Sequence, residues 1–177
     1  MKFDVIIIGG GHSGLSKGIE LLREGKKCLA ITRGQSSRRL RDESYDFKGH
    51  CAEFRRLGGE IFQGDSVLRG RFDRDGRLLR VETRNHGDSA FEADEFYLST
   101  GSFFSGGLVA DISHIFEPIF HLDVEADPLR SQWVNPDFFG PQPFMKYGVK
   151  VDCLGRALKG GKPIANLHPI GSIVSRQ

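Results

Sequence analysis

A glycine cluster directly after a short apolar run limits what this chain can fold into more than any other feature. Residues 3–8 are apolar and rich in β-branched side chains, which is typical of a strand buried on both faces. Gly9-x-Gly11-x-x-Gly14 follows, and apolar residues then recur at helical spacing over residues 13–23. A strand, a glycine turn and a helix in this order predict the start of a nucleotide-binding βαβ unit.

Each glycine of the motif has a physical reason. Gly9 permits a tight turn, Gly11 lets the backbone approach a phosphate with no Cβ in the way, and Gly14 lets the helix pack closely on the strand. The helix start directs unpaired N–H groups and a partial positive charge at the space above it, with the Ser13 hydroxyl as a further donor. A phosphate is the natural occupant. The alternative is a turn of purely structural use, which the surrounding pattern disfavours.

The end of the second strand leaves the identity of the nucleotide open. Residues 27–32 form this strand, and Thr32-Arg33 stand where a dinucleotide site usually carries an acidic residue that binds the adenosine ribose. An arginine there suits the 2′-phosphate of NADP. Equally, no adenosine ribose is bound and a mononucleotide such as FMN fills the site. The glycine motif alone does not separate these readings.

Composition narrows the function classes. Lysine and arginine total 25 against 23 acidic residues, a formal net charge of +2, so no overall charge draws the chain to nucleic acid or anionic membrane. The first apolar run is far shorter than the roughly 20 residues that span a bilayer. The three cysteines contain no C-x-x-C pair and the six histidines are dispersed, which favours a reducing cytoplasm and no metal site. The basic cluster of Arg33, Arg38, Arg39 and Arg41 is interpreted as a solvated loop.

The rest of the chain predicts one domain over residues 1–177, with an interruption. Residues 36–49 are polar and have no sustained period, so they form the predicted junction. Asp75-Gly76 predicts a hairpin turn between two of the later strands. Residues 111–150, rich in aromatics and proline, are predicted to be irregular. The remaining predicted elements are a helix over residues 50–57, strands over residues 60–64, 66–73, 77–84 and 91–100, a glycine-rich loop over residues 101–107, and a last short strand over residues 164–173.

Several further segments, taken in order along the chain, resemble one family. They are FDVIIIGGGHSGL, TRGQSS, TRNH, STGSFFSGGLVA, DFFGPQPF and NLHPIGSI. Together they closely resemble the B component of the anaerobic glycerol-3-phosphate dehydrogenase, a bacterial flavoprotein that forms one subunit of a quinone-linked enzyme. The resemblance implies an α/β fold of the glutathione reductase type. This is a three-layer, Rossmann-like FAD/NAD(P)-binding domain with a parallel sheet and a β-meander.

The same resemblance implies a function. A flavin held by this chain, FMN with FAD as the alternative, relays electrons from glycerol 3-phosphate oxidation toward menaquinone. Two partners are implied: a catalytic subunit that carries its own FAD, and an iron–sulfur subunit that anchors the complex to the membrane. The chain itself is then cytoplasmic and held at the inner membrane only through those partners. Neither insertion into the membrane nor a nucleic-acid partner is expected.

Matched by position, the resemblance carries the cofactor contacts onto four places in this sequence. No catalytic acid, base or nucleophile is assigned, because the flavin carries the chemistry of electron relay. His12 and His168 are the nearest titratable candidates and are interpreted as structural or solvent-facing, since spacing shows no carboxylate partner for either. The implied cofactor-binding residues are Gly9, Gly11, Ser13 and Gly14 in the phosphate loop, Thr32 and Arg33 at the second strand end, Thr100, Gly101 and Ser102 in the later loop, and Gly171 and Ser172 in the last turn.

The chain departs from the family in length, which keeps two other functions open. It lacks a large internal segment of the family, bridged here by residues 38–49, and the family's C-terminal helix, so the second domain is largely absent. A shortened chain suits a non-catalytic nucleotide-binding or assembly module whose Phe103-Phe104 and Phe138-Phe139 pairs anchor an interface. Core packing is the favoured interpretation of these aromatics. A stand-alone NADP-binding reductase fragment is the third reading, and it depends on the arginine that ends the second strand.

Overall fold

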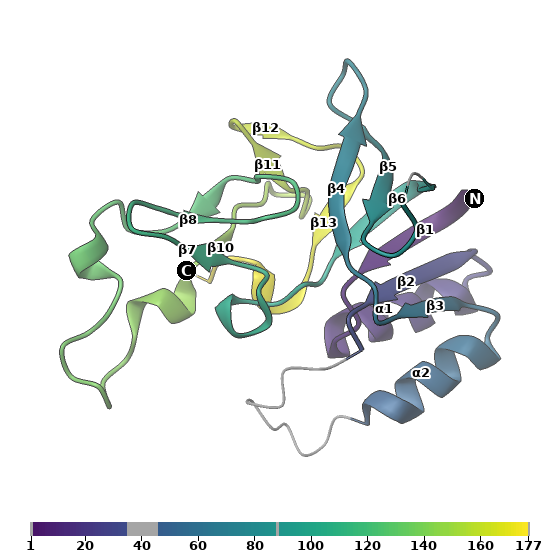
Figure 1. Cartoon of the computed structure of the whole chain (residues 1–177), viewed down its shortest axis with the longest axis horizontal. Coiled ribbons are helices and arrows are strands. Elements are labelled where there is room, and N and C mark those ends of the chain that lie inside the picture. The colour runs from purple at the N-terminus through teal and green to yellow at the C-terminus, as the bar shows by residue number, and fades with distance from the viewer. Residues whose placement is uncertain (1, 35–45, 88, 177) are drawn as a thin grey trace.

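The computed structural model describes residues 2–34, 46–87 and 89–176, and Figure 1 shows their arrangement. The helices are α1 (His12–Arg23) and α2 (Phe47–Arg56). Within the described ranges, no helix has the length and apolarity to cross a membrane. The longer strands are β1 (Lys2–Ile8), β2 (Cys28–Thr32), β3 (Glu60–Gln63), β4 (Val67–Phe72), β5 (Leu78–Thr83) and β6 (Ala90–Leu98). The shorter strands are β7 (Val109–Ala110), β8 (Ile115–Phe116), β9 (Val124–Glu125), β10 (Gly148–Val149), β11 (Leu158–Lys159), β12 (Lys162–Pro163) and β13 (Leu167–Pro169).

The predicted junction at residues 36–49 is wrong at its C-terminal end. α2 begins at Phe47, where the Asp46 side chain accepts a hydrogen bond from the Gly49 N–H at 2.9 Å and caps the helix. A polar run can start a helix once its first N–H groups have such an acceptor. The rest of the junction, with the arginines of the basic cluster that follow Arg33, lies outside the described residues.

One mixed sheet organises the fold. Its strand order is β3-β2-β1-β6-β5-β4, and β13 also pairs with β6. β1 pairs in parallel with β2 and with β6, β2 pairs in parallel with β3, and β6 with β13. β4, β5 and β6 run antiparallel as a meander, with the predicted Asp-Gly turn between β4 and β5. The prediction of a parallel sheet with a β-meander is confirmed.

β6 is shared between the two parts of this sheet. One of its edges pairs with β1, while the other pairs with β5 at residues 90–92 and with β13 at residues 96–98. The buried Asn166 side chain fills the interval. Its Nδ2 donates to the Leu78 carbonyl at 2.8 Å and to the Asp94 carbonyl at 3.0 Å, and its Oδ1 accepts from the Leu78 N–H at 3.0 Å. A side chain therefore supplies ladder hydrogen bonds between the two strands.

Apolar side chains on the two faces of the sheet form two cores. On one face, Val5 and Ile7 of β1 pack with buried residues of α1 and α2. On the other face, Ile6 and Ile8 pack with the meander and with segments that follow β6. Because successive side chains of a strand point to opposite faces, a strand covered on both sides needs apolar residues in succession. Figure 1 shows the layers, with α1 and α2 together below the sheet and the meander above it.

A glycine inside α1 sets the distance between the helices and the sheet. A Cβ on Gly18 would lie 2.4 Å from Phe54 Cε2 of α2 and 2.5 Å from Ile7 Cδ1 of β1. Contacts that short are not tolerated, so glycine is required for this close approach. α1 is thereby held tightly against β1, and its first turn stays fixed at the carboxyl end of that strand.

The aromatic residues of the second half of the chain are mostly not in the core. Residues 107–150 contain short strand pairs and 3-10 turns, which agrees with the predicted irregularity. Phe103 packs against the core, but Phe104 is 47% exposed, Phe138 82% and Phe139 93%. The core-packing interpretation is therefore wrong for three of the four rings. The reason is that the loop carrying Phe138 and Phe139 hydrogen bonds to itself and does not fold over the sheet.

Candidate functional site

Three chain segments converge at the carboxyl ends of β1, β6 and β13. The glycine turn follows β1, the second glycine-rich loop follows β6, and a turn around Gly171 follows β13. Backbone hydrogen bonds join them: the Ser99 N–H donates to the Ile8 carbonyl at 2.7 Å, and the Ile170 N–H donates to the Leu98 carbonyl at 2.9 Å. Ligands of open α/β sheets bind outside such strand ends.

Backbone contacts explain most glycines of the first loop. Gly9 has a φ of +103°, and a Cβ there would lie 2.2 Å from the Ser99 carbonyl oxygen. A Cβ on Gly14 would lie 2.6 Å from the Gly9 carbonyl oxygen, so this glycine lets α1 start directly beside the turn. Gly11 differs, because a Cβ there would meet no described protein atom within 4 Å. The space above Gly11 is therefore free for another group.

The start of α1 is an electropositive end at this loop. Gly11 is the N-cap residue, and its carbonyl accepts the first helical hydrogen bond, from the Leu15 N–H at 3.0 Å. The N–H groups that precede Leu15 in the first turn have no acceptor within the helix. The first turn of α1 contains no acidic residue, and its N-cap makes no side-chain hydrogen bond. An anion at this position is stabilised by the N–H groups and by the helix dipole.

Thr32 and Arg33 end β2 in different surroundings. Thr32 is buried, its side chain fills the space that a Cβ on Gly10 would need, and its Oγ1 accepts a hydrogen bond from the Gly34 N–H at 3.2 Å. Arg33 is exposed, and its guanidinium donates to the Ser105 carbonyl in the loop after β6. Since β1 lies between β2 and β6, the Arg33 side chain crosses the carboxyl end of β1. It places a cation beside the glycine turn.

The second glycine-rich loop contributes a buried hydroxyl. Thr100 Oγ1 has no hydrogen-bond partner among the described residues. Buried hydroxyls nearly always have one, so this group is suited to hydrogen bond with a bound molecule. Gly101, with a φ of +78°, turns the chain immediately afterwards, and a Cβ there would lie 3.6 Å from Ser172 Oγ. Ser102 follows and precedes a short 3-10 turn.

The last turn closes the remaining side. Gly171 has a φ of +74°, and a Cβ there would lie 2.5 Å from Ser13 Oγ of α1. Ser172 is exposed in the 3-10 turn Gly171–Ile173. The structure therefore brings the four predicted groups of residues to one end of the sheet. The Ser13 hydroxyl faces the Gly171 turn.

These groups fit the phosphate end of a nucleotide cofactor. They offer the N–H donors of a helix start, the Thr100 hydroxyl, the Arg33 cation and an open position at Gly11. Within the described residues, no three His, Cys, Asp or Glu side chains gather so that they could hold a metal ion. The donor set suits an anionic group, and its cradle has no room for side chains at Gly9 or Gly14.

The interpretation that His168 lacks a carboxylate partner is wrong. Its Nε2 lies 2.9 Å from Glu95 Oε2, and its ring is tilted against that of Tyr97 with the ring centroids 5.3 Å apart. Chain spacing hides this pair, because the pairing of β13 with β6 brings together residues 73 positions apart. His12, at the start of α1, is exposed, and its ring lies 5.6 Å from that of His50.

Sequence reasoning misses a buried carboxylate beside the end of β2. Asp65 is 2% exposed, its N–H donates to the Thr32 carbonyl at 3.2 Å, and its Oδ2 lies 2.8 Å from His86 Nδ1. Burial raises the pKa of Asp65, but hydrogen bonds from Thr83, the Ser66 N–H and His86 outweigh it and hold the pKa below its usual value. The TRNH segment is the available sequence signal, since it carries two of these partners.

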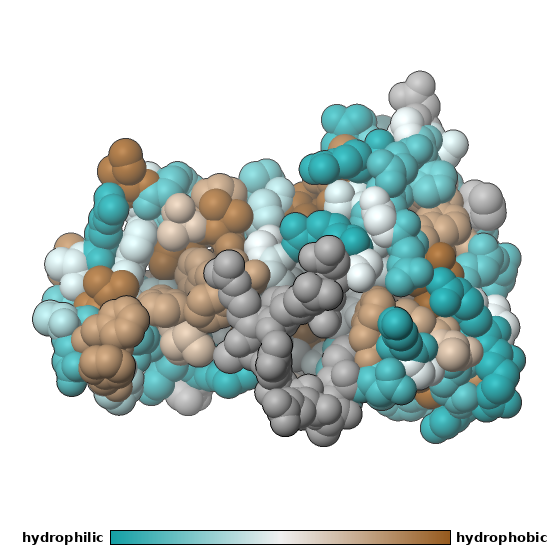
Figure 2. Space-filling model, turned by 60° about the horizontal axis from the view of Figure 1, so that its bottom comes forward, coloured by the Kyte–Doolittle hydropathy of each residue, from teal (hydrophilic) through white to brown (hydrophobic). Residues whose placement is uncertain are grey.

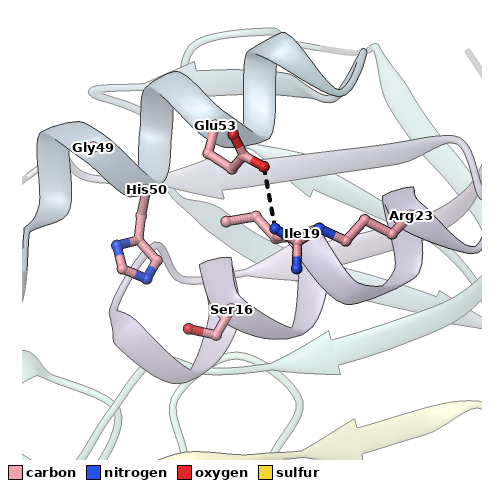
Figure 3. A pocket seen from close by; sticks show the side chains of 6 residues that line it. All are labelled: Ser16, Ile19, Arg23, Gly49, His50 and Glu53. Atoms are coloured by element: carbon pink, nitrogen blue, oxygen red, sulfur yellow. Dashed lines mark hydrogen bonds and ion pairs between the residues drawn. The ribbon is translucent and has the colours of Figure 1, made fainter.

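A pocket of about 370 Å³ lies between α1 and α2 (Figure 3). An ion pair of 3.2 Å between Arg23 and Glu53 joins the two helices there. Hydrogen bonds from Arg56 and then from Arg23 lower the pKa of Glu53 to about 2. The contact holds α2 against α1 and so supports the helix that carries the glycine turn. The pocket is lined by Ser16, Ile19, Arg23, Gly49, His50 and Glu53.

Fold and site together define a FAD-binding domain. A family model described as "FAD binding domain" matches residues 4–40 and 46–176, and the chain belongs to that family. Its curated relatives are named as the B component, one subunit, of the anaerobic glycerol-3-phosphate dehydrogenase, which confirms the resemblance noted from the sequence.

The relatives are much longer than this chain. The protein of Yersinia enterocolitica is 44% identical over 121 residues, which cover 68% of this chain and 28% of the relative. That of Vibrio vulnificus (strain YJ016) is 43% identical over 124 residues, 69% of this chain and 28% of the relative. The chain thus spans about 28% of the length of these curated relatives. Among solved structures, a thioredoxin reductase from Gloeobacter violaceus superposes with a TM-score of 0.49 at 17% identity, over 63% of this chain and 39% of that one.

Proposed function

We propose that this chain is a flavin-binding subunit of an oxidoreductase of the glycerol-3-phosphate:quinone type. The observation that supports it most is the convergence of the glycine turn, the Arg33 cation and the buried Thr100 hydroxyl at one end of the sheet. The family of the chain supports a flavin, and the shared name of its relatives supplies the reaction. In this role, the chain relays electrons from glycerol 3-phosphate oxidation toward menaquinone.

The first loop and α1 hold the phosphate of the flavin in this proposal. The N–H groups at the start of α1 and the guanidinium of Arg33 neutralise its charge, and Gly11 permits a close approach. Gly101 and Ser102, with Thr100 before them, flank the flavin on the β6 side, and Gly171-Ser172 on the β13 side. A bound flavin supplies the electron transfer, while the protein orients it and excludes water.

FMN is the flavin that we propose, with FAD as the alternative. β2 ends in Thr32-Arg33 and offers no carboxylate to an adenosine ribose, which supports a mononucleotide. Asp65, the carboxylate beside this strand end, is already engaged by His86 and by the Ser66 N–H. The description of the matched family supports FAD. Chromatography of the pigment released by acid separates the two.

The proposal includes a domain organisation and partners. Residues 1–177 form one flavin-binding domain, and the junction at residues 36–49 marks the place of a second domain in the longer family members. An interruption of the family match at residues 41–45 supports this. The word "subunit" in the name of the relatives supports partner chains. We propose a catalytic subunit with its own FAD, and an iron–sulfur subunit that anchors the complex at the cytoplasmic face of the membrane.

Flavin retention tests the proposal. The purified chain, incubated with FMN and desalted, is expected to keep an absorbance band near ~450 nm. Gly11→Val fills the open position and is expected to lower flavin retention at least tenfold while far-UV circular dichroism stays unchanged. Ala52→Val, on the exposed face of α2, adds a similar volume away from the site and serves as the control.

Other outcomes would support the other functions. Undiminished flavin in Gly11→Val contradicts the phosphate cradle. A colourless wild-type chain that still binds a partner subunit favours the assembly module. Fluorescence quenching by NADPH without any flavin favours the reductase fragment.

A further inference from the structure

Two adjacent phenylalanines project from one loop into solvent. Phe138 is 82% exposed and Phe139 is 93% exposed. Their rings meet edge to face, with centroids 5.3 Å apart and planes at 90°. Burying a side chain of this size is strongly favourable, so large exposed aromatics placed side by side indicate an interaction surface.

The loop that carries them is braced by its own polar side chains. Gln142 Nε2 donates to the Asp137 carbonyl at 3.0 Å and to the Gly140 carbonyl at 3.3 Å, while Gln142 Oε1 accepts from the Asn135 N–H at 3.0 Å. Asn135 Oδ1 accepts from the Asp137 N–H at 2.9 Å, and Asp137 Oδ1 accepts from the Phe139 N–H at 3.1 Å. Such bracing fixes the two rings before any partner arrives, which lowers the entropy cost of binding.

The base of this loop contacts the candidate cofactor site. The ring of Phe144 lies 5.9 Å from that of Phe103 and 6.3 Å from that of Phe104, centroid to centroid. Both phenylalanines directly follow the Thr100-Gly101-Ser102 segment of the site. A protein bound at Phe138 and Phe139 would therefore sit against the part of the chain that is continuous with the site.

Cations surround the two rings. Arg130, Lys146 and Arg176 are exposed, and none of them forms an ion pair within the described part of the chain. Arg176 lies beside Lys146, since its N–H donates to the Lys146 carbonyl at 2.9 Å. The acids of this region, Asp127 and Asp137, each accept a backbone N–H. The three cations and two acids give the rim a small positive excess, which a partner with acidic side chains around an apolar cleft complements.

The surface of this chain does not offer a matching cleft for a second copy. One described pocket is lined mainly by Ser16, Arg23, His50 and Glu53, and the other has charged side chains at most of its lining positions. Neither receives an aromatic pair without burying charge. Apolar residues (brown) gather on the left of Figure 2, on the side where Figure 1 places β7, β8 and β10.

We propose that the braced loop of residues 135–142 is the docking anchor for the catalytic partner subunit, which receives Phe138 and Phe139 in an apolar cleft with an acidic rim. The inference rests on the proposed function, because the partner is the one that function requires. It adds the surface, the residues that carry the affinity and the chemistry of the receiving cleft. Hot spots of this kind combine a rigid aromatic anchor with near-neutral surroundings.

A binding titration tests the anchor. The probe is the catalytic subunit of glycerol-3-phosphate dehydrogenase type encoded in the same genome, immobilised and titrated with the full-length chain. The wild-type chain is expected to bind one to one. Phe138→Ser with Phe139→Ser is expected to raise Kd at least about 100-fold, since each of two hot-spot aromatics contributes more than tenfold. Gln142→Ala, which keeps both rings but removes the brace, is expected to raise Kd about tenfold.

A matched control separates docking from general stickiness. Ile112→Ser removes an apolar side chain that is also 82% exposed, and it is expected to leave Kd within twofold of wild type. Unchanged melting temperatures show that each variant is folded. Raising the salt concentration is expected to weaken wild-type binding, because the rim cations are exposed.

Four results would overturn the anchor. The first is a wild-type chain that does not bind the probe, and the second is a double serine variant that binds like wild type. The third is Phe-dependent self-association in sedimentation, which assigns the surface to a second copy. The fourth is Phe-dependent binding to phosphatidylglycerol vesicles with no binding to the probe, which assigns it to a lipid surface. Flavin retention, measured on the same samples, is independent: its loss contradicts the proposed function but not a Phe-dependent complex.

Discussion

Asn166 is the residue whose replacement tests the fold most directly. Its amide makes three hydrogen bonds between β5 and β6, at 2.8, 3.0 and 3.0 Å, and its side chain is fully buried. Asn166→Ala leaves the Leu78 N–H and the Leu78 and Asp94 carbonyls without these partners. An unsatisfied buried polar group costs about 1–3 kcal/mol, so the three together cost about 3–5 kcal/mol when small relaxations are allowed.

That loss is a large part of the stability of a domain, which is typically about 5–15 kcal/mol. For a chain of this length, each kcal/mol lowers the Tm by roughly 2–4 °C, so the variant is expected to melt about 10 °C or more below wild type. Urea unfolding followed by circular dichroism measures the free energy directly. Asn85→Ala, which removes one exposed hydrogen bond to the Gly64 carbonyl, is the control and is expected to lose less than about 1 kcal/mol. An Asn166→Ala variant within about 1 kcal/mol of wild type would refute the reasoning.

Three further predictions concern the site and its supports. Gly14→Ala is expected to destabilise the chain by about 1–3 kcal/mol in urea unfolding, since its Cβ would lie 2.6 Å from the Gly9 carbonyl, whereas Gly11→Ala, with open space, is expected to leave stability equal or up to about 1 kcal/mol higher; equal losses would contradict the geometry. Arg33→Ala is expected to weaken FMN binding roughly tenfold in a fluorescence titration, and more at low salt than at high salt, while a salt-independent affinity would contradict an electrostatic role. The pKa of Asp65 is lowered in the fold, so its ionised form stabilises the chain above about pH 4 and this stability is lost as the pH falls through the lowered pKa; Asp65→Asn is expected to flatten the stability-versus-pH curve on the acid side, and an unchanged curve would count against the cluster.

Features that follow from local pattern were predictable from the sequence. The first strand, the glycine turn and α1 need only apolar periodicity and the steric freedom of glycine, and the structure confirms them. The hairpin between β4 and β5 follows from its Asp-Gly turn. The start of α2 was missed, because a single capping carboxylate at Asp46 decides where that helix begins.

Features that depend on distant partners were not predictable. The His168–Glu95 pair, the Arg33 bond to Ser105 and the Asn166 bridge each join residues that only the sheet order brings together. Burial of aromatic residues is similar, since phenylalanine suits a core and an interface equally well. For Phe138, the deciding factor was a network of amide hydrogen bonds within its own loop.

The place of β6 in the sheet has a consequence for how the chain is made. During translation, β1, α1, β2 and β3 leave the ribosome well before residues 90–98, the strand that covers the free edge of β1. Until then, a strand with three successive isoleucines has one open edge and an uncovered face, which favours pairing with other nascent chains. The long delay between β1 and β6 also slows folding, because contacts distant in sequence form late. Synthesis at low temperature, or with chaperones that shield apolar segments, is therefore expected to raise the yield of the native protein.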